Sequence, residues 1–520
     1  MDENVSLTRQ IGQRMMAGFD GPRLDDAFVD LVKTHKVGNV ILFKWNITGK
    51  EQLNKLCEEI QQLVMRETGR PAFIAIDQEG GAVSRLSEDA TCVPGAMAIA
   101  ATGDPENAYQ AGRLTGLELR ALGVNFNLAP VLDVNSNDAN PVIGVRSYGE
   151  KPETVIRYAL PMMRGLEDSG TLSCGKHFPG HGDTSVDSHL ALPVVDKTMD
   201  ELRSVELAPF QAAIDAGLPA VMTSHIVFPQ VDAGTPATLS RRILTGLLRE
   251  EMGFDGLIMT DCLEMKAIQH SVGTVRGTVE AIQAGADLVL VSHTASLAAE
   301  AAEAIRRALE SGEIDRAEWE RSLERIAALK ADYLSRPAPE LSIVGSEAHT
   351  RENRKLLERT LTPIRVPGGR FPDLGSRPRH LGCPVFRATR VSNLDDDPLT
   401  FPAFMAEKLG GSAEATPSNP TEEDIAAIVE RAADASGIVI GTYNGHLYPG
   451  QIELVNRLAS LGVPVVAVAL RNPYDLRLLN PNVWSLAAYE YTAKAFDAVA
   501  AVLRGEAEAA GKPTVTVLAD

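Results

Sequence analysis

Short apolar runs alternate with longer amphipathic stretches through the first 335 residues of the 520-residue chain. The runs are rich in Val, Ile, Leu and Met, which is typical of buried strands in a parallel sheet. The stretches between them, such as 104–122, 153–168 and 199–216, place apolar residues on one face and charges on the other, as surface helices do. Eight runs have the length and composition of strands: 15–19, 37–43, 72–76, 124–128, 172–175, 220–223, 256–259 and 286–291.

Eight strand–helix units in about 300 residues are what a (β/α)8 TIM barrel requires, so we predict an α/β protein that begins with this fold. A doubly wound parallel sheet is the alternative. Polar residues gather directly after several runs, in the segments IAIDQEGG, CGKHFPGHGD, MTSH and MTDCLEM. Because the carboxyl ends of barrel strands lie at one rim, we expect these segments to meet there and form the functional site.

A second domain is predicted after the barrel. The segment SRPAPELSIVGS, which follows a helical stretch at 316–333, is rich in Pro, Ser and Gly, as interdomain linkers often are. Beyond it, the apolar runs 437–444 and 464–470 alternate with helical stretches at 422–433 and 450–461. We therefore predict a barrel over 1–335, a linker over 336–350 and a smaller α/β sandwich over 351–520.

Composition and net charge narrow the range of partners that the protein could bind. Hydrophobic residues make up 44% of the chain and charged residues 23%, which is typical of a globular protein with a large core. The formal net charge of -19 would repel nucleic acid and anionic membranes, since polyanion binding relies on Lys and Arg. We therefore expect neither as a partner, and a neutral or small substrate instead.

The cysteines and the hydropathy pattern point to the cytoplasm. The five cysteines are scattered and show no C-x-x-C spacing, which favours reduced thiols. The N-terminal segment MDENVSLTRQIGQRMM is polar, unlike a signal peptide, and no run of about 18 apolar residues predicts a membrane span. A cytoplasmic location is the resulting expectation.

The densest cluster of chemically active side chains is the segment KHFPGHGDTSVDSH. Its Pro and Gly residues break regular structure, so we expect a loop after a strand, where polar residues serve water or function. Its ionisable residues are Lys176, His177, His181, Asp183, Asp187 and His189.

Two chemical interpretations of this loop compete. One is a metal site with His177, His181 and His189 as ligands, although the spacing is not that of a zinc helix or finger and Lys176 would place a cation beside the metal. In the other, Asp187 orients His189, so that one imidazole nitrogen is fixed and the other exchanges a proton with substrate.

Four motifs in order, AIDQEGGAVSRL, PVIGVRSY, KHFPGHGDTSVDSH and MTDCLEM, closely resemble glycoside hydrolase family 3, and within it the NagZ-type β-N-acetylglucosaminidases. The resemblance covers the first domain. The second resembles the α/β sandwich of longer members but carries no specific motif. The resemblance implies that Asp261 is the nucleophile, that Asp187 and His189 form an acid/base dyad, and that the sugar is held by Asp77, Arg85, Arg146, Lys176 and His177.

These implied roles suit the chemistry. A retaining glycosidase needs an ionised carboxylate about 5 Å from a proton donor, and Asp261 ends the seventh apolar run, at the expected rim. Carboxylates accept hydrogen bonds from sugar hydroxyls, while Lys and Arg donate to sugar oxygens. For Arg85 and Arg146 the alternative is an internal ion pair that braces the loops. Cys262, next to the nucleophile, is expected to be a packing thiol or a modest tuning element.

The resemblance implies a retaining, exo-acting β-N-acetylhexosaminidase (EC 3.2.1.52 type) that removes terminal N-acetylglucosamine from muropeptides during peptidoglycan recycling, with no metal or organic cofactor. All residues assigned a role precede the linker, so the second domain is expected to be dispensable for chemistry. The alternatives are a phosphorylase, since neutral His189 would not repel phosphate, and a carbohydrate-binding protein on a degenerate barrel, although Asp187, His189 and Asp261 are all present.

Overall fold

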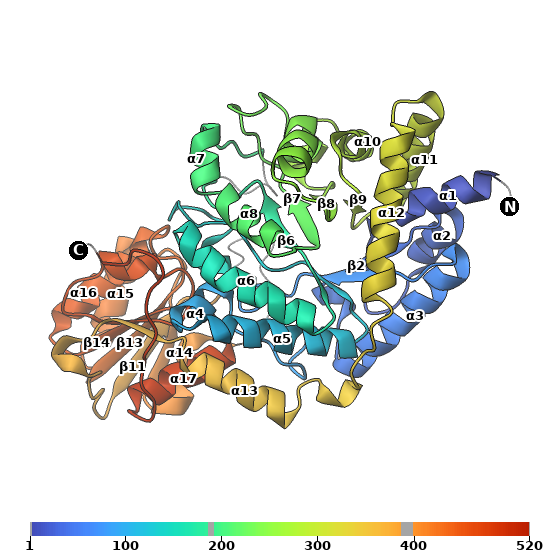
Figure 1. Cartoon of the computed structure of the whole chain (residues 1–520). Coiled ribbons are helices and arrows are strands. Elements are labelled where there is room, and N and C mark those ends of the chain that lie inside the picture. Colours follow the sequence, from blue (N-terminus) through green and yellow to red (C-terminus); the bar gives the residue numbers. More distant parts are fainter. Residues whose placement is uncertain (1–2, 186–191, 386–398, 519–520) are drawn as a thin grey trace.

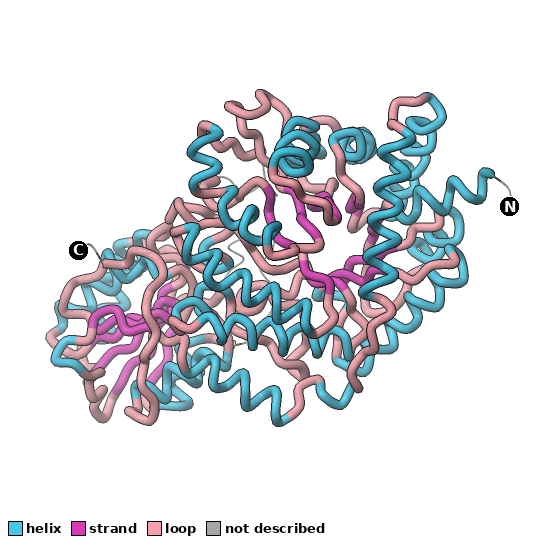
Figure 2. Tube along the Cα trace, viewed as in Figure 1, coloured by secondary structure: helices cyan, strands magenta, loops and turns pink. Residues whose placement is uncertain are grey.

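The computed structural model describes residues 3–185, 192–385 and 399–518 and contains two sheets in separate regions of the molecule (Figures 1 and 2). The first is a parallel sheet with the strand order β5-β4-β3-β2-β1-β9-β8-β7-β6. Its strands are β1 (Met15–Ala17), β2 (Asn39–Leu42), β3 (Phe73–Ile76), β4 (Phe126–Asn127), β5 (Leu172–Ser173), β6 (Gly175–Phe178), β7 (Ala220–Thr223), β8 (Leu257–Cys262) and β9 (Leu288–Val291).

All eight predicted runs contain a strand, and the fifth contains the start of two. β5 pairs with β4, and β6 pairs with β7 on the other side. Between them, the Cys174 N–H donates to the carbonyl of Ala129 at 2.9 Å. Val131, which follows β4, forms a parallel bridge to Lys176, so the sheet curls into a nearly closed barrel. The predicted TIM-like barrel is confirmed.

Helices surround the barrel, as Figure 1 shows. Their apolar faces and the outward side chains of the strands form one core cluster, while the inward side chains, such as Phe73, Phe126 and Met259, form another. The helices are α1 (Glu3–Gln13), α2 (Asp26–His35), α3 (Lys50–Thr68), α4 (Ala96–Ala101), α5 (Pro105–Ala121), α6 (Pro152–Asp168), α7 (Met199–Ser204), α8 (Leu207–Asp215), a π-helix at Arg242–Glu251, α9 (Lys266–Gln269), α10 (Thr274–Ala284), α11 (Ala295–Ser311) and α12 (Arg316–Tyr333).

The predicted helix at 199–216 is two helices. α7 begins at a capping box in which Thr198 and Glu201 satisfy each other's backbone N–H groups, and it ends at Ser204. Pro209 has no N–H to donate to the carbonyl of Val205, so it sits in the first turn of a new helix, α8, rather than inside a continuous one.

The second sheet has the order β10-β15-β14-β13-β11-β12 and is parallel except for the β10–β15 pair. Apolar residues of α15 and α16 pack on one face and those of α14 and α17 on the other, which confirms the predicted α/β sandwich. Its elements are α13 (Glu347–Glu358), β10 (Thr362–Arg365), β11 (Pro378–Gly382), α14 (Phe401–Leu409), β12 (Ser412–Ala415), α15 (Glu422–Ala432), β13 (Gly437–Thr442), α16 (Pro449–Leu458), β14 (Val465–Ala469), a 3-10 helix at Pro473–Leu478, β15 (Trp484–Ala487) and α17 (Ala493–Leu503).

The core of the second sheet is not confined to that domain. Met97, Ala98 and Ala101 of α4, together with Val145, belong to the same apolar cluster as β13, α15 and α16. In Figure 1, α4 lies beside this sheet. α13 begins at Glu347, inside the segment predicted as linker, and the predicted domain boundaries stay a prediction.

No helix within the described ranges is both long enough and apolar enough to cross a bilayer.

Candidate active site

The polar segments that follow the strands meet at one end of the barrel. Asp77 directly follows β3, Lys176 and His177 lie in β6, and Asp261 lies near the end of β8. These are the carboxyl ends of parallel strands, where barrel enzymes carry their catalytic groups.

Lys176 joins two carboxylates. Its ammonium Nζ lies 2.6 Å from Asp77 Oδ1 and 2.6 Å from Glu79 Oε1, and its side chain is buried. Burial alone would lower the pKa of Lys176, but the charges of Asp77 and Glu79 raise it above its ordinary value. Lys176 is therefore a fixed cation, and two of its three hydrogens are engaged by carboxylates.

Arg146 forms a second ion pair with Glu79. Its Nε and Nη2 donate to the two carboxylate oxygens at 2.9 and 2.8 Å. Nη2 also contacts His177 Nε2 at 3.3 Å, and Nη1 donates to the carbonyl of Val142 at 3.3 Å. Burial opposes ionisation of Glu79, yet Arg146 and Lys176 hold its pKa well below the usual range. Arg146 thus forms an internal ion pair, which was the alternative to sugar binding in the sequence analysis. Four of its five N–H donors face protein partners, which leaves one for a sugar.

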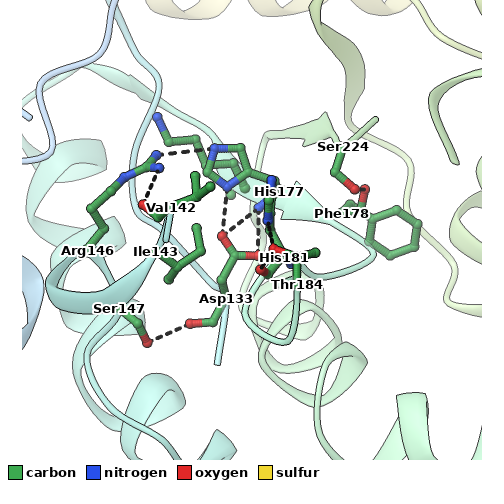
Figure 3. A network of polar contacts seen from close by, with 12 residues as sticks. Asp133, Val142, Ile143, Arg146, Ser147, His177, Phe178, His181, Thr184 and Ser224 are labelled. Carbon is green, nitrogen blue, oxygen red and sulfur yellow. Dashed lines mark hydrogen bonds and ion pairs between the residues drawn. The ribbon is translucent and has the colours of Figure 1, made fainter. Parts of the chain in front are cut away.

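His177 is held between Arg146 and Asp133 (Figure 3). Its Nδ1 lies 2.7 Å from Asp133 Oδ2, and its Nε2 faces the guanidinium. Burial, together with the nearby charges of Arg146 and Lys176, lowers the pKa of His177 to about 3, while burial raises that of Asp133 to about 6. At neutral pH the imidazole of His177 is therefore neutral. It donates from Nδ1 to the ionised carboxylate of Asp133 and accepts from Arg146 at Nε2.

His181 completes this network. Its backbone N–H donates to Asp133 Oδ1 at 2.7 Å, and its Nδ1 lies 2.8 Å from Thr184 Oγ1. Burial and the neighbouring His177 lower its pKa to about 4, so it too is neutral near pH 7. Asp133 therefore fixes the imidazole of His177 in β6 and, at His181, the backbone of the loop that follows.

These contacts bear on the metal interpretation. Both ring nitrogens of His177 already face protein partners, which leaves neither for a metal. Within 3–185, 192–385 and 399–518, no three His, Cys, Asp or Glu side chains are arranged to hold an ion. The third proposed ligand, His189, lies outside the described residues, as does Asp187, so the acid/base dyad stays a prediction.

Asp261 belongs to the same site. The backbone N–H of Cys262 donates to its Oδ1 at 2.6 Å, which fixes the carboxylate at the strand end. Its charge also acts on the buried imidazole of His177. The carbonyl of Cys262 lies 2.9 Å from His225 Nε2. Burial raises the pKa of the Cys262 thiol to about 12, in keeping with a packing role.

Arg85 lies on the loop after β3, and the loop itself holds it in place. Gln78 accepts from the Arg85 backbone N–H through Oε1 at 2.8 Å and donates to Ser84 Oγ at 2.8 Å. The guanidinium is buried. Burial opposes ionisation of Asp77, but the charges of Lys176 and Arg85 lower its pKa, which places Arg85 beside the Asp77–Lys176 pair.

The structure adds two carboxylates that sequence reasoning did not assign. Glu79 lies inside the quoted motif AIDQEGG, where its neighbour Asp77 drew the assignment. Asp133 comes at the end of the apolar segment that follows β4. The other predicted site residues are also singled out because they follow an apolar run, so the same signal could have found Asp133. Together with Asp77 and Asp261, Glu79 and Asp133 give the site four carboxylates around Lys176, Arg146 and two neutral histidines, an arrangement suited to hydroxyl groups rather than to a highly charged ligand.

Comparisons with known proteins agree with this geometry. Residues 6–329 match the family described as Glycosyl hydrolase family 3 N terminal domain. The chain is 36% identical over 370 residues to "Beta-hexosaminidase A" of Pseudoalteromonas piscicida, covering 65% of this chain and 61% of that protein's length. It is 40% identical over 270 residues to "Beta-hexosaminidase" of Thiobacillus denitrificans, covering 51% of this chain and 74% of that protein.

A solved structure is similar along almost the whole chain. The glycoside hydrolase family 3 beta-N-acetylglucosaminidase from Paenibacillus sp. str. FPU-7 superposes with a TM-score of 0.91 at 39% identity, covering 98% of this chain and 99% of that one. The family match spans more than half of the 520 residues and contains the whole rim cluster. The chain therefore belongs to glycosyl hydrolase family 3.

Proposed function

We propose that this protein is a retaining, exo-acting β-N-acetylhexosaminidase that removes a terminal β-linked N-acetylglucosamine. The observation that carries the proposal is the position of Asp261 at the same barrel rim as the Asp77–Lys176 pair. The similarity to proteins named as hexosaminidases supports the choice of sugar.

In the proposed first step, the carboxylate of Asp261 attacks C1 of the sugar while protonated His189 donates to the leaving oxygen. The C1–oxygen bond breaks and a glycosyl ester forms on Asp261. Neutral His189, oriented by Asp187, then takes a proton from water, which attacks C1 and releases the sugar and the carboxylate. The neutral tautomer of His177 suits it to accepting or positioning rather than to supplying this proton.

Asp77 and Lys176 bind the sugar directly, and Arg85, Arg146 and His177 line the same subsite beside them. Lys176 keeps one hydrogen for a sugar hydroxyl after its two carboxylates are satisfied. The side chain of Asp77 is 18% exposed and that of Glu79 only 6%, so of the two carboxylates that hold Lys176, Asp77 is the one placed to accept from a ligand. Arg146 acts mainly by holding Glu79 and His177.

Fragments of peptidoglycan are the natural substrates we propose, and their cytoplasmic turnover is the proposed context. The five cysteines, all of them among the described residues, are free thiols, and three are fully buried, which suits a reducing compartment.

A panel of aryl glycosides tests the sugar class. The p-nitrophenyl β-N-acetylglucosaminide should be hydrolysed with a far higher kcat/KM than the β-glucoside or β-xyloside. A preference for the β-glucoside would refute the assignment. Running the reaction in phosphate separates hydrolysis, which gives free sugar, from phosphorolysis, which gives a sugar 1-phosphate.

Asp261→Asn tests the nucleophile, since the change is nearly isosteric but removes the attacking charge. Turnover should almost vanish while the unfolding temperature is kept. Asp255, an exposed residue just before the same strand, supplies the matched control Asp255→Asn, which should be fully active. A 5-fluoro glycosyl substrate should label the wild-type peptide that contains MTDCLEM, and labelling of any other carboxylate would move the nucleophile.

A further inference from the structure

In the loop that carries Arg146, several backbone N–H groups donate to the side chains of two buried asparagines, Asn135 and Asn140. Asn140 Oδ1 accepts from the N–H groups of Val142 and Ile143, each at 2.8 Å, and its Nδ2 donates to the His181 carbonyl at 2.8 Å. Asn135 Oδ1 accepts from the Gly144 N–H at 2.9 Å. These bonds tie the loop to the catalytic rim, close to the His177 network of Figure 3.

One link in this chain of bonds comes from the second domain. Asn472, which directly precedes the 3-10 helix Pro473–Leu478, accepts through Oδ1 from the N–H of Val145, the residue before Arg146, at 2.9 Å. Tyr474 accepts through its hydroxyl from Asn135 Nδ2 at 2.8 Å. Asn472 is 3% exposed and Tyr474 is 1% exposed, so both contacts are shielded from water.

The turn is shaped to receive Asn472. Gly144 has φ +48, and a Cβ added there would lie 2.3 Å from Asn472 Oδ1, so no larger residue fits without moving the amide. The side chain of Val145 packs into the apolar core of the second domain. Backbone and side chain of the turn Gly144–Arg146 are therefore both held by the second domain.

The consequence reaches the site through a single residue. Arg146 holds Glu79 through two bonds and faces the acceptor nitrogen of His177, while Glu79 in turn holds Lys176. A small displacement of the turn would move the guanidinium and, with it, Glu79, Lys176 and His177 out of the arrangement that binds the sugar. Misplacement of this kind by about 1 Å can cost on the order of 100-fold in rate.

We infer that Asn472 is a positioning residue, through which the second domain sets the place of Arg146 and hence of the sugar-binding cluster in the barrel. The inference rests on the proposed function for the identity of the sugar. It also replaces the sequence-based expectation that the second domain contributes nothing to the chemistry. Asn472 touches no substrate; it acts through the backbone of Val145.

A double-mutant cycle in the full-length protein tests this inference. Asn472→Ala should lower kcat/KM for p-nitrophenyl β-N-acetylglucosaminide on the order of 10- to 100-fold, by analogy with residues that orient metal ligands. In an Arg146→Lys background the same change should cost about 2-fold or less, because the residue through which it acts is already impaired. Equal losses in both backgrounds, or no loss, would overturn the inference.

Three further variants separate positioning from folding. Asn456→Ala is the matched control, since Asn456 also accepts a backbone N–H, from Asn480 at 2.7 Å, but lies within the second domain, and its variant should keep full activity. Asn472→Asp keeps an oxygen acceptor and should restore most of the activity. If Asn472→Ala does not fold, Gly144→Ala approaches the same contact from the barrel and should reproduce the loss.

The Kd for N-acetylglucosamine is also measured by calorimetry for the wild-type protein, the two single variants and the double variant of the cycle. Absence of hydrolysis by the wild-type protein would refute the proposed function, yet coupled losses in Kd would still support the positioning role. Additive losses in Kd together with a normal wild-type activity would overturn the positioning role alone.

Discussion

Glu79 is the residue at which the two cations of the site meet. Both of its oxygens are used by Arg146, and one also binds Lys176, so its charge is shared between two groups that would otherwise repel each other. A buried carboxylate in this position does not need to touch the sugar to matter. Its role is to keep two positive charges close together in a site that is nearly closed to water.

We expect Glu79→Gln to impair activity strongly, although the two side chains have nearly the same shape. The amide keeps an oxygen for one donor but removes the compensating charge, so Lys176 and Arg146 should separate and Asp77 should lose its fixed partner. We expect a decrease in kcat/KM on the order of 100-fold, by analogy with groups that orient active-site ligands. Steady-state kinetics checks this, with Glu88→Gln, an exposed glutamate of the same loop, as the control that should change nothing.

His189→Ala tests the acid/base role predicted from sequence. Without a proton donor, hydrolysis of a natural disaccharide should nearly stop, whereas a dinitrophenyl glycoside, whose leaving group needs little help, should still react in the first step. The glycosyl-enzyme should then accumulate, and azide should speed its decay. Asp187→Ala should give a weaker version of the same pattern. Equal losses on both substrates with no effect of azide would instead assign His189 to binding.

Sequence reasoning at this scale singles out residues that follow an apolar run, such as Asp77, Lys176 and Asp261, because strand ends can be read approximately from apolar runs. Glu79 and Asp133 are found only in the structure, because their significance lies in partners far along the chain. Arg146 is 67 residues from Glu79, and no local pattern pairs the two. The neutral state of His177 likewise depends on burial and on nearby charges, which spacing does not reveal.

At the scale of elements, the strands and long helices of the barrel follow the hydrophobic pattern closely. The predicted helix at 316–333 matches α12 residue for residue, with Asp315 as the cap that accepts from the Glu318 N–H at 2.8 Å. The split between β5 and β6 is not predicted, because the run 172–175 is continuous in the sequence and only the pairing partners on its two sides divide it. In the second domain, β13 and β14 are predicted, whereas β10, β11, β12 and β15 are not. For β12 the reason is its low burial, which leaves no apolar run in the sequence.

The amino ends of β8 and β9 are closed by a charge cluster far from the rim. Asp287, just before β9, binds Arg249 and accepts from Arg325 at 3.1 Å and from the Ile258 N–H at 2.8 Å. We expect Asp287→Asn to reduce the free energy of unfolding by about 3 to 5 kcal/mol, since it leaves a largely buried arginine without its charge partner. Urea unfolding measures this. Below the unfolding transition KM should match that of the wild type, and a changed KM would show that this end of the barrel is coupled to the site.

At the scale of the whole molecule, Glu490 of the second domain reaches the loop that follows β3. Its Oε1 accepts from the Gly95 N–H at 2.7 Å, and a Cβ added to Gly81 would lie 2.9 Å from the same oxygen. Together, Glu490 and Asn472 bring the second domain into contact with both loops that carry residues proposed to bind the sugar. Burial raises the pKa of Glu490 to about 7.

This shift predicts a pH-dependent stability. The folded protein holds the Glu490 proton more tightly than the unfolded chain, whose glutamate titrates near 4.5. The stabilisation is therefore fully present below about pH 4.5 and is lost as the pH rises through about 7. Glu490→Gln cannot ionise and should gain in unfolding temperature over the wild type progressively across this range. Glu430→Gln, at an exposed glutamate, should show a constant difference, and a constant difference for Glu490→Gln would contradict the assignment.

The apolar cluster that joins α4 and Val145 to the second sheet has a consequence for engineering by recombination. A barrel from one family member and a sandwich from another would meet across a surface in which Met97, Ala98 and Ala101 must fit foreign neighbours. A chimera divided at the linker should therefore express poorly or aggregate. A chimera that also takes residues 96–101 and 142–146 from the donor of the sandwich should fold. These residues pack in the same core as the second sheet, so they must be exchanged together with it.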